Sequence, residues 1–563
     1  MDPKPDPAHP DTVWWGWGLA DRHHALPAST RNLLTEVFGV SGEPRPPVAL
    51  GDVRLPPSAP PAAARAALVD VVGAEFVRDD AVARVAHCRG RSTPDLLRVR
   101  AGDASDAPDL VVSPADHDEV QALLVVCAAH RLAAVPFGGG TSVVGGLAPE
   151  RAGFAGVVAI DLARLDRLLA VDLTSATATF EPGVRGPRAE HLLAEHGLTL
   201  GHVPQSFEHA SIGGFAATRS SGQASAGYGR FDAMVVALRV ATPTGTWELG
   251  RAPASAAGPD LRQLVLGSEG AFGVITSVTV RVHHRPAVTV YEAWRAPDFL
   301  TGAAALRRLA QEGPLPTVAR VSDETETAVG LATAQPADPA GGSDSAPGRD
   351  RESGPREGGE PGGGCLLVTA YAGSTRDVDY RRAEVTRVLL AAGLTPLSPA
   401  AGDAWVRGRF EGPYLRDALL DVGVVAETLE TAGFWSTLPA LYQGVRDAVT
   451  SALAGGGTVV PLVMAHVSHV YPTGASLYFT VVYPAGSDPV GAWRAAKSAA
   501  SDAIVAAGGT ITHHHAVGTD HRPWLGAEVG PIGLAVLRAV KDTIDPGGIL
   551  NPGVLIPAGT APE

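Results

Sequence analysis

The strongest constraint on how this chain folds is a run of glycines at residues 136–146, Pro-Phe-Gly-Gly-Gly-Thr-Ser-Val-Val-Gly-Gly. Glycines let a backbone approach a ligand closely and turn successive N–H groups toward one anion, and Thr141 and Ser142 add hydroxyl donors. The run is not a Walker loop, because Gly145 is followed by glycine rather than lysine, and it lacks the spacing of a Rossmann turn. We interpret it as a diphosphate cradle of another type; by itself it also fits a glycine-rich surface loop.

Apolar periodicity before this run predicts an alternation of strands and helices. Residues 110–112 and 133–135 are short apolar stretches. A helix between them is indicated by four apolar residues at helical spacing, Val120, Leu123, Leu124 and Cys127. We expect Ser113 to cap this helix and Pro114 to occupy its first position.

Other segments extend this α/β pattern. Residues 278–282 alternate valine with polar residues, which predicts a half-buried strand. Residues 334–364 contain almost no apolar side chains, which predicts a disordered insertion. Beyond it, we expect strands at 365–371 and 477–482 framing helices such as 417–431, and therefore a mixed α+β domain.

Composition excludes several classes of function. The net charge of −14 argues against nucleic-acid binding, which needs a clustered basic surface. The three cysteines form no CxxC pair, so neither a disulfide framework nor a cysteine zinc site is expected. The polar N-terminus and the lack of a 20-residue apolar run predict a cytoplasmic protein without a signal peptide or a membrane span.

Two further glycine-rich segments, at residues 211–222 and 267–276, follow the first in order. Together with the ending Asp-Pro-Gly-Gly-Ile-Leu-Asn-Pro-Gly at 545–553, they resemble the FAD-binding domain of the vanillyl-alcohol-oxidase superfamily, also called PCMH-type. The resemblance implies non-covalent FAD, because members that attach the flavin to this loop carry histidine where this chain has Thr141. It assigns FAD contacts to Pro136, Gly138, Gly139, Gly140, Thr141, Ser142, Gln205, Ser211, Gly213, Gly214, Thr218, Ser221, Glu269, Gly273 and Ile275.

This resemblance implies an α+β fold with a two-lobed FAD-binding domain and a cap domain. We expect four parts: an N-terminal helical region at 1–105, the FAD-binding domain at 106–286, a cap or substrate domain at 287–505 that includes the insertion, and a C-terminal segment at 506–563 that returns to the flavin.

A triple histidine within residues 510–518, Thr-Ile-Thr-His-His-His-Ala-Val-Gly, resembles the histidine loop of the alkyldihydroxyacetonephosphate synthase family. Segments at 14–18, 201–204, 320–323 and 475–479, and Tyr471, follow the same family. The resemblance implies a catalytic set of Tyr478, His513, His514, His515 and Arg320, with Tyr478 as acid/base. It implies substrate contacts from His466, His469 and Arg320.

The residues themselves leave alternatives open for this site. In an extended segment His513 and His515 share one face and His514 the other. The histidines could hydrogen-bond in an active site, serve only packing, or bind a metal, for which only Asp520 and His521 are near as further ligands; we expect no metal. Tyr478 could be core, and a catalytic role requires that cations, which we expect to be His515 and Arg320, lower its pKa.

Two positions depart from the family pattern. Animal members carry aspartate where this chain has Gln205, and arginine where it has His466. Losing that guanidinium weakens bidentate recognition of a substrate phosphate.

The resemblance implies an exchange without net redox, in which acyl-dihydroxyacetone phosphate loses its fatty acid and gains a fatty alcohol, with FAD as electron sink and covalent handle. The alternatives are an FAD-dependent 2-hydroxy-acid dehydrogenase that passes hydride to flavin N5, and a flavin-binding scaffold without turnover. We expect a small-molecule or lipid substrate and a homodimer, and peripheral membrane contact is compatible with such a substrate.

Overall fold

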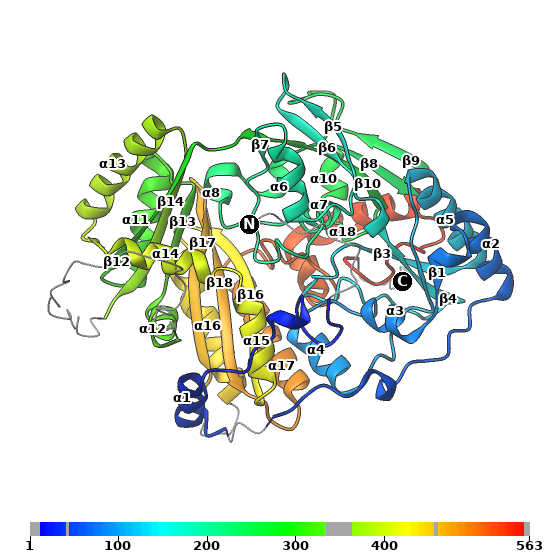
Figure 1. The fold of residues 1–563 in the computed structure, drawn as a ribbon, viewed down its shortest axis with the longest axis horizontal. Coiled ribbons are helices and arrows are strands. Elements are labelled where there is room, and N and C mark those ends of the chain that lie inside the picture. The colour runs from blue at the N-terminus through cyan, green and yellow to red at the C-terminus, as the bar shows by residue number, and fades with distance from the viewer. Residues whose placement is uncertain (1–11, 41–43, 334–362, 455–459, 557–563) are drawn as a thin grey trace, which may run out of the picture.

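The computed structural model describes residues 12–40, 44–333, 363–454 and 460–556. In Figure 1 a seven-stranded sheet with its helices forms one half of the molecule, and three smaller sheets lie in the other half. The predicted α+β class, with a two-lobed domain and a cap, is confirmed. Most of the predicted insertion, residues 334–362, lies outside the described residues.

The first lobe is a four-stranded sheet in the order β1-β2-β4-β3, in which β2, β3 and β4 are parallel. The strands are β1 (Val77–Arg78), β2 (Leu110–Val112), β3 (Leu132–Phe137) and β4 (Gly156–Asp161). Helices α2 (Ala62–Val72) and α5 (His117–His130) share a core with them.

Helix α5 begins later than predicted. The four apolar residues at helical spacing are fully buried, as expected. However, the cap is Asp116, which accepts a hydrogen bond from the N–H of Glu119, and not Ser113. A carboxylate with acidic residues in the first turn caps the helix dipole better than the Ser-Pro pair, which stays outside the helix.

The second lobe is an antiparallel sheet in the order β5-β6-β10-β8-β9. Its strands are β5 (Leu168–Asp172), β6 (Thr177–Phe180), β8 (Val235–Thr242), β9 (Gly245–Leu249) and β10 (Val274–Arg281). Around it lie α6 (Gly186–Ala194), α7 (Ile212–Thr218), α8 (Ser225–Tyr228), α9 (Phe231–Met234), α10 (Arg262–Val265) and the pair β7 (Leu198–Thr199) and β11 (His283–His284). The predicted alternation in β10 is confirmed, because Val278 and Val280 are fully buried while Arg281 is exposed.

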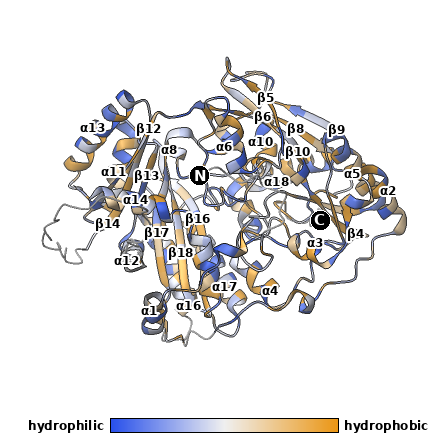
Figure 2. Ribbon diagram, viewed as in Figure 1, coloured by the Kyte–Doolittle hydropathy of each residue, from blue (hydrophilic) through white to orange (hydrophobic). Residues whose placement is uncertain are grey.

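The cap is an antiparallel sheet in the order β15-β12-β14-β13-β17-β18-β16. Its strands are β12 (Val288–Ala296), β13 (Val318–Ser322), β14 (Cys365–Gly373), β15 (Thr395–Pro396), β16 (Val424–Phe434), β17 (Leu462–Val470) and β18 (Gly474–Pro484). The helices are α11 (Phe299–Glu312), α12 (Glu324–Thr333), α13 (Thr375–Ala391), α14 (Pro399–Gly408), α15 (Gly412–Leu420), α16 (Leu438–Ala454) and α17 (Pro489–Ala506). Helices α11, α13, α16 and α17 share one apolar core with the strands, and Figure 2 shows the strands largely apolar and the outer helix turns polar.

The predicted helix at 417–431 is wrong. Only its first residues belong to a helix, α15, and the chain then turns at Gly423, where φ is 76°, and continues as strand β16. The β-branched residues of this stretch favour a strand, and β16 pairs with β18 along its whole length.

Both ends of the chain pack against these halves. The N-terminal part contains α1 (Ala28–Phe38), α3 (Ala81–Ala86) and α4 (Thr93–Arg100), and the C-terminal part contains α18 (Leu525–Ile544). After α18 the chain returns to β3, where the N–H of Ala134 donates to Ile549 and the N–H of Asn551 donates to Ala134. No helix among the described residues is long and apolar enough to span a membrane.

Candidate active site

A single cavity of about 1340 Å³ runs along the three glycine-rich segments and beneath the cap sheet. Every residue that the sequence assigned to cofactor binding lines this cavity, although the three segments are far apart in the chain. The predicted residues Tyr478, His514, His515, Arg320, His466 and His469 line it as well. Of the predicted set, only His513 is absent from its wall.

The first glycine segment forms a tight cradle. A Cβ atom on Gly139 would lie 2.1 Å from the carbonyl oxygen of His209. Gly140 has a φ of 67°, and a Cβ there would lie 2.6 Å from the ring of Phe137. Side chains are therefore excluded from this backbone, which suits close contact with a diphosphate.

Glu269 joins three segments at the cradle. Its Oε2 accepts hydrogen bonds from the N–H groups of Val517 and Gly518, just after the triple histidine, and its carbonyl oxygen accepts one from Asn551. Its buried Oε1 has no hydrogen-bond partner within the described part of the chain. Burial raises the pKa of Glu269 to about 8, so the carboxyl is neutral at pH 7 and can donate to an anionic ligand.

Strand alternation explains the polar wall under the cap. In β18, Leu477 and Phe479 face the apolar core, and Tyr478 between them faces the cavity. Cross-strand pairing places His466 of β17 and Glu430 of β16 directly beside Tyr478. The rings of His466 and Tyr478 are stacked with their centroids 5.0 Å apart.

Glu430 organises the histidine loop. Its carboxylate accepts hydrogen bonds from the hydroxyl of Thr512 and from the N–H groups of His513, His514 and His515. Burial raises the pKa of Glu430, but the three histidines and the Thr512 hydroxyl outweigh burial and hold it well below the usual range. A buried carboxylate with four donors is therefore the fixed charge of this site.

The expected alternation of the three histidines is wrong, because the loop bends around Glu430 instead of running extended. His513 and His514 are neighbours, with their Nδ1 atoms 2.9 Å apart. His514 and His515 both line the cavity, with ring centroids 4.9 Å apart. His513 turns away from the cavity, and its Nε2 is hydrogen-bonded to the hydroxyl of Tyr471 at 2.6 Å.

The expected lowering of the Tyr478 pKa is also wrong for this protein without ligands. Burial and the nearby carboxylates raise the pKa of Tyr478 to about 12, and Arg320 offsets this only in part. His515 is not a cation, because burial lowers its pKa to about 3. Tyr478 therefore holds its proton, and its ring lies at right angles to that of His515, with the centroids 5.5 Å apart.

The guanidinium of Arg320 is already engaged by other side chains of the protein. Its Nη2 lies 2.6 Å from Glu326 and 3.1 Å from His466 Nδ1. Burial opposes ionisation of Glu326, but His466 and Arg320 lower its pKa to about 2. Part of the Arg320 charge is thus neutralised inside the protein.

A β-bulge between Val467 and Val470 turns both Ser468 and His469 into the cavity wall. The ligand atoms of His469, His513 and His514 lie within 4.8 Å of one another, close enough for a metal ion. His513 and His514 already contact each other through their Nδ1 atoms.

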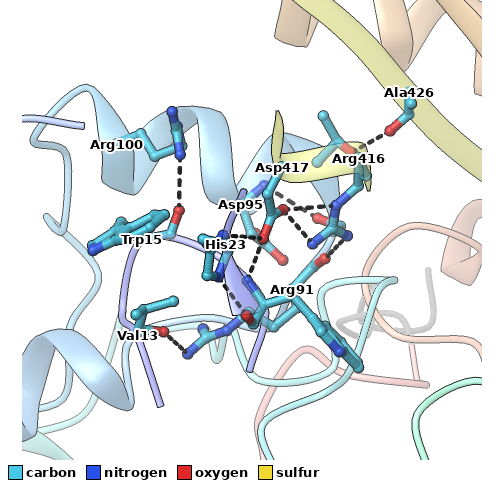
Figure 3. A network of polar contacts seen from close by, with 12 residues as sticks. Val13, Trp15, His23, Arg91, Asp95, Arg100, Arg416, Asp417 and Ala426 are labelled. Carbon is cyan, nitrogen blue, oxygen red and sulfur yellow. Dashed lines mark hydrogen bonds and ion pairs between the residues drawn. The ribbon is translucent and has the colours of Figure 1, made fainter. Parts of the chain in front are cut away.

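An N-terminal segment closes one side of the cavity. Trp17 and Arg22 line the cavity, and the backbone N–H of Trp17 donates to the buried Asp417 of α15. Figure 3 shows the surrounding network, in which Arg416 pairs with Asp417 and also donates to the carbonyl of Arg91. The cap and the N-terminal region are therefore tied together beside the cavity.

The sequence reasoning missed Glu430 and Glu326, and it gave Trp17 no role in the site although the segment 14–18 follows the family. Glu430 lay at the end of a segment predicted to be helical, where its direction could not be inferred. Alternation against Leu429 and the aromatic strand at 477–482 was the signal that could have revealed it.

Two family models match the chain. One, described as the FAD binding domain, matches residues 108–249, and the other, described as FAD linked oxidases, C-terminal domain, matches residues 285–555. The cradle, the Glu269 oxygen without a hydrogen-bond partner among the described residues and the large cavity along the glycine-rich segments fit such a cofactor.

Three curated relatives are named alkyldihydroxyacetonephosphate synthase, and another carries the name of an FAD-linked oxidoreductase. The alkyldihydroxyacetonephosphate synthase of Dictyostelium discoideum is 34% identical, over 85% of this chain and 78% of that protein. The one of Trypanosoma brucei brucei is 31% identical, over 98% of this chain and 93% of that protein. A solved alkyldihydroxyacetonephosphate synthase structure superposes with a TM-score of 0.80 and 29% identity, covering 96% of this chain and 98% of its own. This chain therefore binds FAD and belongs to the alkyldihydroxyacetonephosphate synthase family.

Proposed function

We propose that this protein exchanges the acyl group of acyl-dihydroxyacetone phosphate for a fatty alcohol, forming an ether bond without net redox. The carbon–oxygen bond to the fatty acid breaks, the bond to the alcohol oxygen forms, and the fatty acid is released. Non-covalent FAD supplies an electron sink and a covalent handle during the exchange.

One observation carries this proposal: a single cavity joins the cofactor cradle to the polar cap wall and to an apolar wall. The apolar part is lined by α1, β17, β18 and neighbouring helices, including Leu34, Phe38, Leu419, Met464 and Val482. Such a wall suits the hydrocarbon chain of a fatty substrate, whose burial is favourable by about 0.8 kcal/mol for each CH₂ group.

The polar wall supplies the proton chemistry in this proposal. Tyr478 moves a proton at the substrate carbon beside the cradle, and His515 orients the phenol through its neutral ring. Substrate binding nearby must lower the pKa of Tyr478 from about 12 for it to act as a base. A bound phosphate takes its hydrogen bonds from His466, His469 and the nitrogens of Arg320 that Glu326 leaves free.

The test is direct product analysis. Purified protein with FAD is incubated with acyl-dihydroxyacetone phosphate and hexadecanol, and the products are measured by mass spectrometry. We expect ether product and free fatty acid in a ratio of one to one. Free fatty acid without ether product would contradict the proposal, because it would show hydrolysis only.

The setting of the enzyme is proposed on the same basis. The exposed apolar residues Val529, Ile532 and Val536 of α18 support a homodimer, and exposed Val37 and Val460 support peripheral contact with a membrane that holds the fatty substrates. We place the protein in the cytoplasm. We further propose that residues 106–286 with 506–563 bind FAD, that 287–505 bind substrate, and that 1–105 brace both.

A further inference from the structure

Three side chains connect the main cavity with a second cavity of about 490 Å³. Tyr471 lines the second cavity, and His514 lines the main one. His513 lies between them, with Nε2 2.6 Å from the hydroxyl of Tyr471 and Nδ1 2.9 Å from Nδ1 of His514. The contacts form one continuous chain of exchangeable protons.

The chain has two possible directions, and in each of them every hydrogen bond has one donor and one acceptor. If the phenol donates to Nε2 of His513, then Nδ1–H of His513 donates to His514, whose proton is on Nε2. In the opposite direction every proton shifts to the partner atom. Each proton that passes along the chain therefore reverses the direction of its hydrogen bonds, and a second proton that passes the other way restores the first direction.

The surroundings keep the chain neutral between passages. Burial lowers the pKa of His513 well below its usual range and also lowers that of His514, against the attraction of Glu430. The other charged neighbour, Arg230, donates to the carbonyl oxygen of His513 and is paired with Asp232. Like Ser221, it also hydrogen-bonds the hydroxyl of Tyr471. His469 stacks on His513 and is neutral as well, because burial lowers its pKa.

In the proposed route for the exchange one proton moves in each direction. The departing carboxylate oxygen takes up a proton and leaves as the acid, and the entering alcohol later gives up its hydroxyl proton. Of the two groups proposed to act at the substrate carbon, Tyr478 has a pKa of about 12 and keeps its proton at pH 7, and His515 has a pKa of about 3 and takes none up.

We propose that Tyr471, His513 and His514 form a proton relay between the reaction cavity and the second cavity. His514 donates a proton to the departing acid and is refilled through His513 and Tyr471 from water. When the alcohol bonds, its proton returns along the same path to water, so protons balance and the chain regains its first direction. The role of the relay in turnover rests on the proposed function, whereas the protonation states of its histidines do not depend on it.

The functional test compares Tyr471→Phe with Tyr483→Phe. Tyr483 lies in the neighbouring strand, its hydroxyl contacts only the carbonyl of Pro489 among the hydrogen bonds of the described chain, and it lines neither cavity. We expect Tyr471→Phe to lower kcat by about tenfold or more with unchanged KM and FAD content, within the range of a lost proton-transfer group. Imidazole should restore much of that loss, and Tyr483→Phe should behave like the wild type.

A second measurement needs no turnover. NMR spectra of ¹⁵N-histidine-labelled holoprotein, assigned with His513→Gln, should show His513 and His514 as neutral rings with complementary tautomers, and Tyr471→Phe should change the His513 signals. A normal kcat for Tyr471→Phe, a loss that imidazole does not restore, charged imidazolium rings, or a stoichiometric metal on these histidines would each overturn the relay. Absence of ether product with wild-type protein, together with the expected tautomers, would instead refute only the proposed function.

Discussion

The two walls of the main cavity are built by different means. The cradle wall is formed largely by backbone, because Gly139 and Gly140 allow no side chain. Each of its glycine-rich segments is a continuous stretch of sequence. The cap wall is side chains: Tyr478, His466 and Glu430 come from three strands that meet only through sheet pairing. A ligand common to a whole superfamily needs the first kind of wall, while the chemistry of one family is set by the second.

This contrast predicts that substitutions in the cradle remove the cofactor, whereas substitutions in the cap wall leave it bound and remove turnover. The strongest case is Gly140→Asp, which adds a Cβ in a left-handed conformation 2.6 Å from the ring of Phe137 and a negative charge at the proposed diphosphate cradle. We expect FAD affinity to fall by roughly 100-fold or more, seen as loss of the yellow colour and in fluorescence titration. The matched control is Gly197→Asp, because Gly197 has a φ of 70° and a Cβ there would meet nothing within 4 Å. A variant Gly140→Asp with stoichiometric FAD would refute the cradle.

The next effect is expected at Tyr478. Tyr478→Phe keeps the ring between His466 and His515 and removes only the hydroxyl. Turnover should fall by roughly 100-fold or more while FAD content stays stoichiometric. His515→Ala should behave in the same way, and the double variant should be far less impaired than the product of the two. Near-normal ether formation by Tyr478→Phe would show that this residue is only part of the packing.

Glu430→Gln should give an intermediate effect on stability. The glutamine NH₂ group would replace one acceptor oxygen of the carboxylate. Its N–H donors would then face the N–H groups of the histidine loop, which is a repulsive contact. We expect the free energy of unfolding to fall by about 3 kcal/mol, measured by denaturant titration of the FAD-bound protein. Glu312→Gln, at an exposed ion pair with Arg308, should change it by less than about 0.5 kcal/mol. Equal stability of both variants would contradict the organising role of Glu430.

The smallest expected effect is the pH dependence of FAD affinity, which we assign to Glu269 in the cradle wall. Its pKa of about 8 is raised above the usual value, so the neutral form prevails below pH 8 and the charged form above it. Ionisation places a negative charge beside the diphosphate, so FAD affinity should fall by up to about tenfold between pH 7 and pH 9. Glu269→Gln should bind FAD with a flat pH profile over this range. An unchanged pH dependence in that variant would assign the titration to another group.

The same contrast explains what the sequence could predict. The cradle and the strand β10 depend on local glycine and valine patterns, so they were predictable, and the return of the chain at 545–553 was implied by the family resemblance. Glu430 depends on strand register: the apolar residues around 417–425 also fit a helix, and only pairing with β18 places its carboxylate under the histidine loop. The neutral states of His515 and Tyr478 depend on burial by distant segments, which no local pattern reveals.

The most direct test of the account is the absorbance spectrum of the flavin during anaerobic turnover. The account predicts that acyl-dihydroxyacetone phosphate and fatty alcohol are converted to ether product over many turnovers while the flavin regains its oxidised spectrum without any electron acceptor. It also predicts that 2-hydroxy acids leave the spectrum unchanged. Stoichiometric bleaching of the flavin by a 2-hydroxy acid, without ether formation from the other substrates, would contradict it and identify a dehydrogenase.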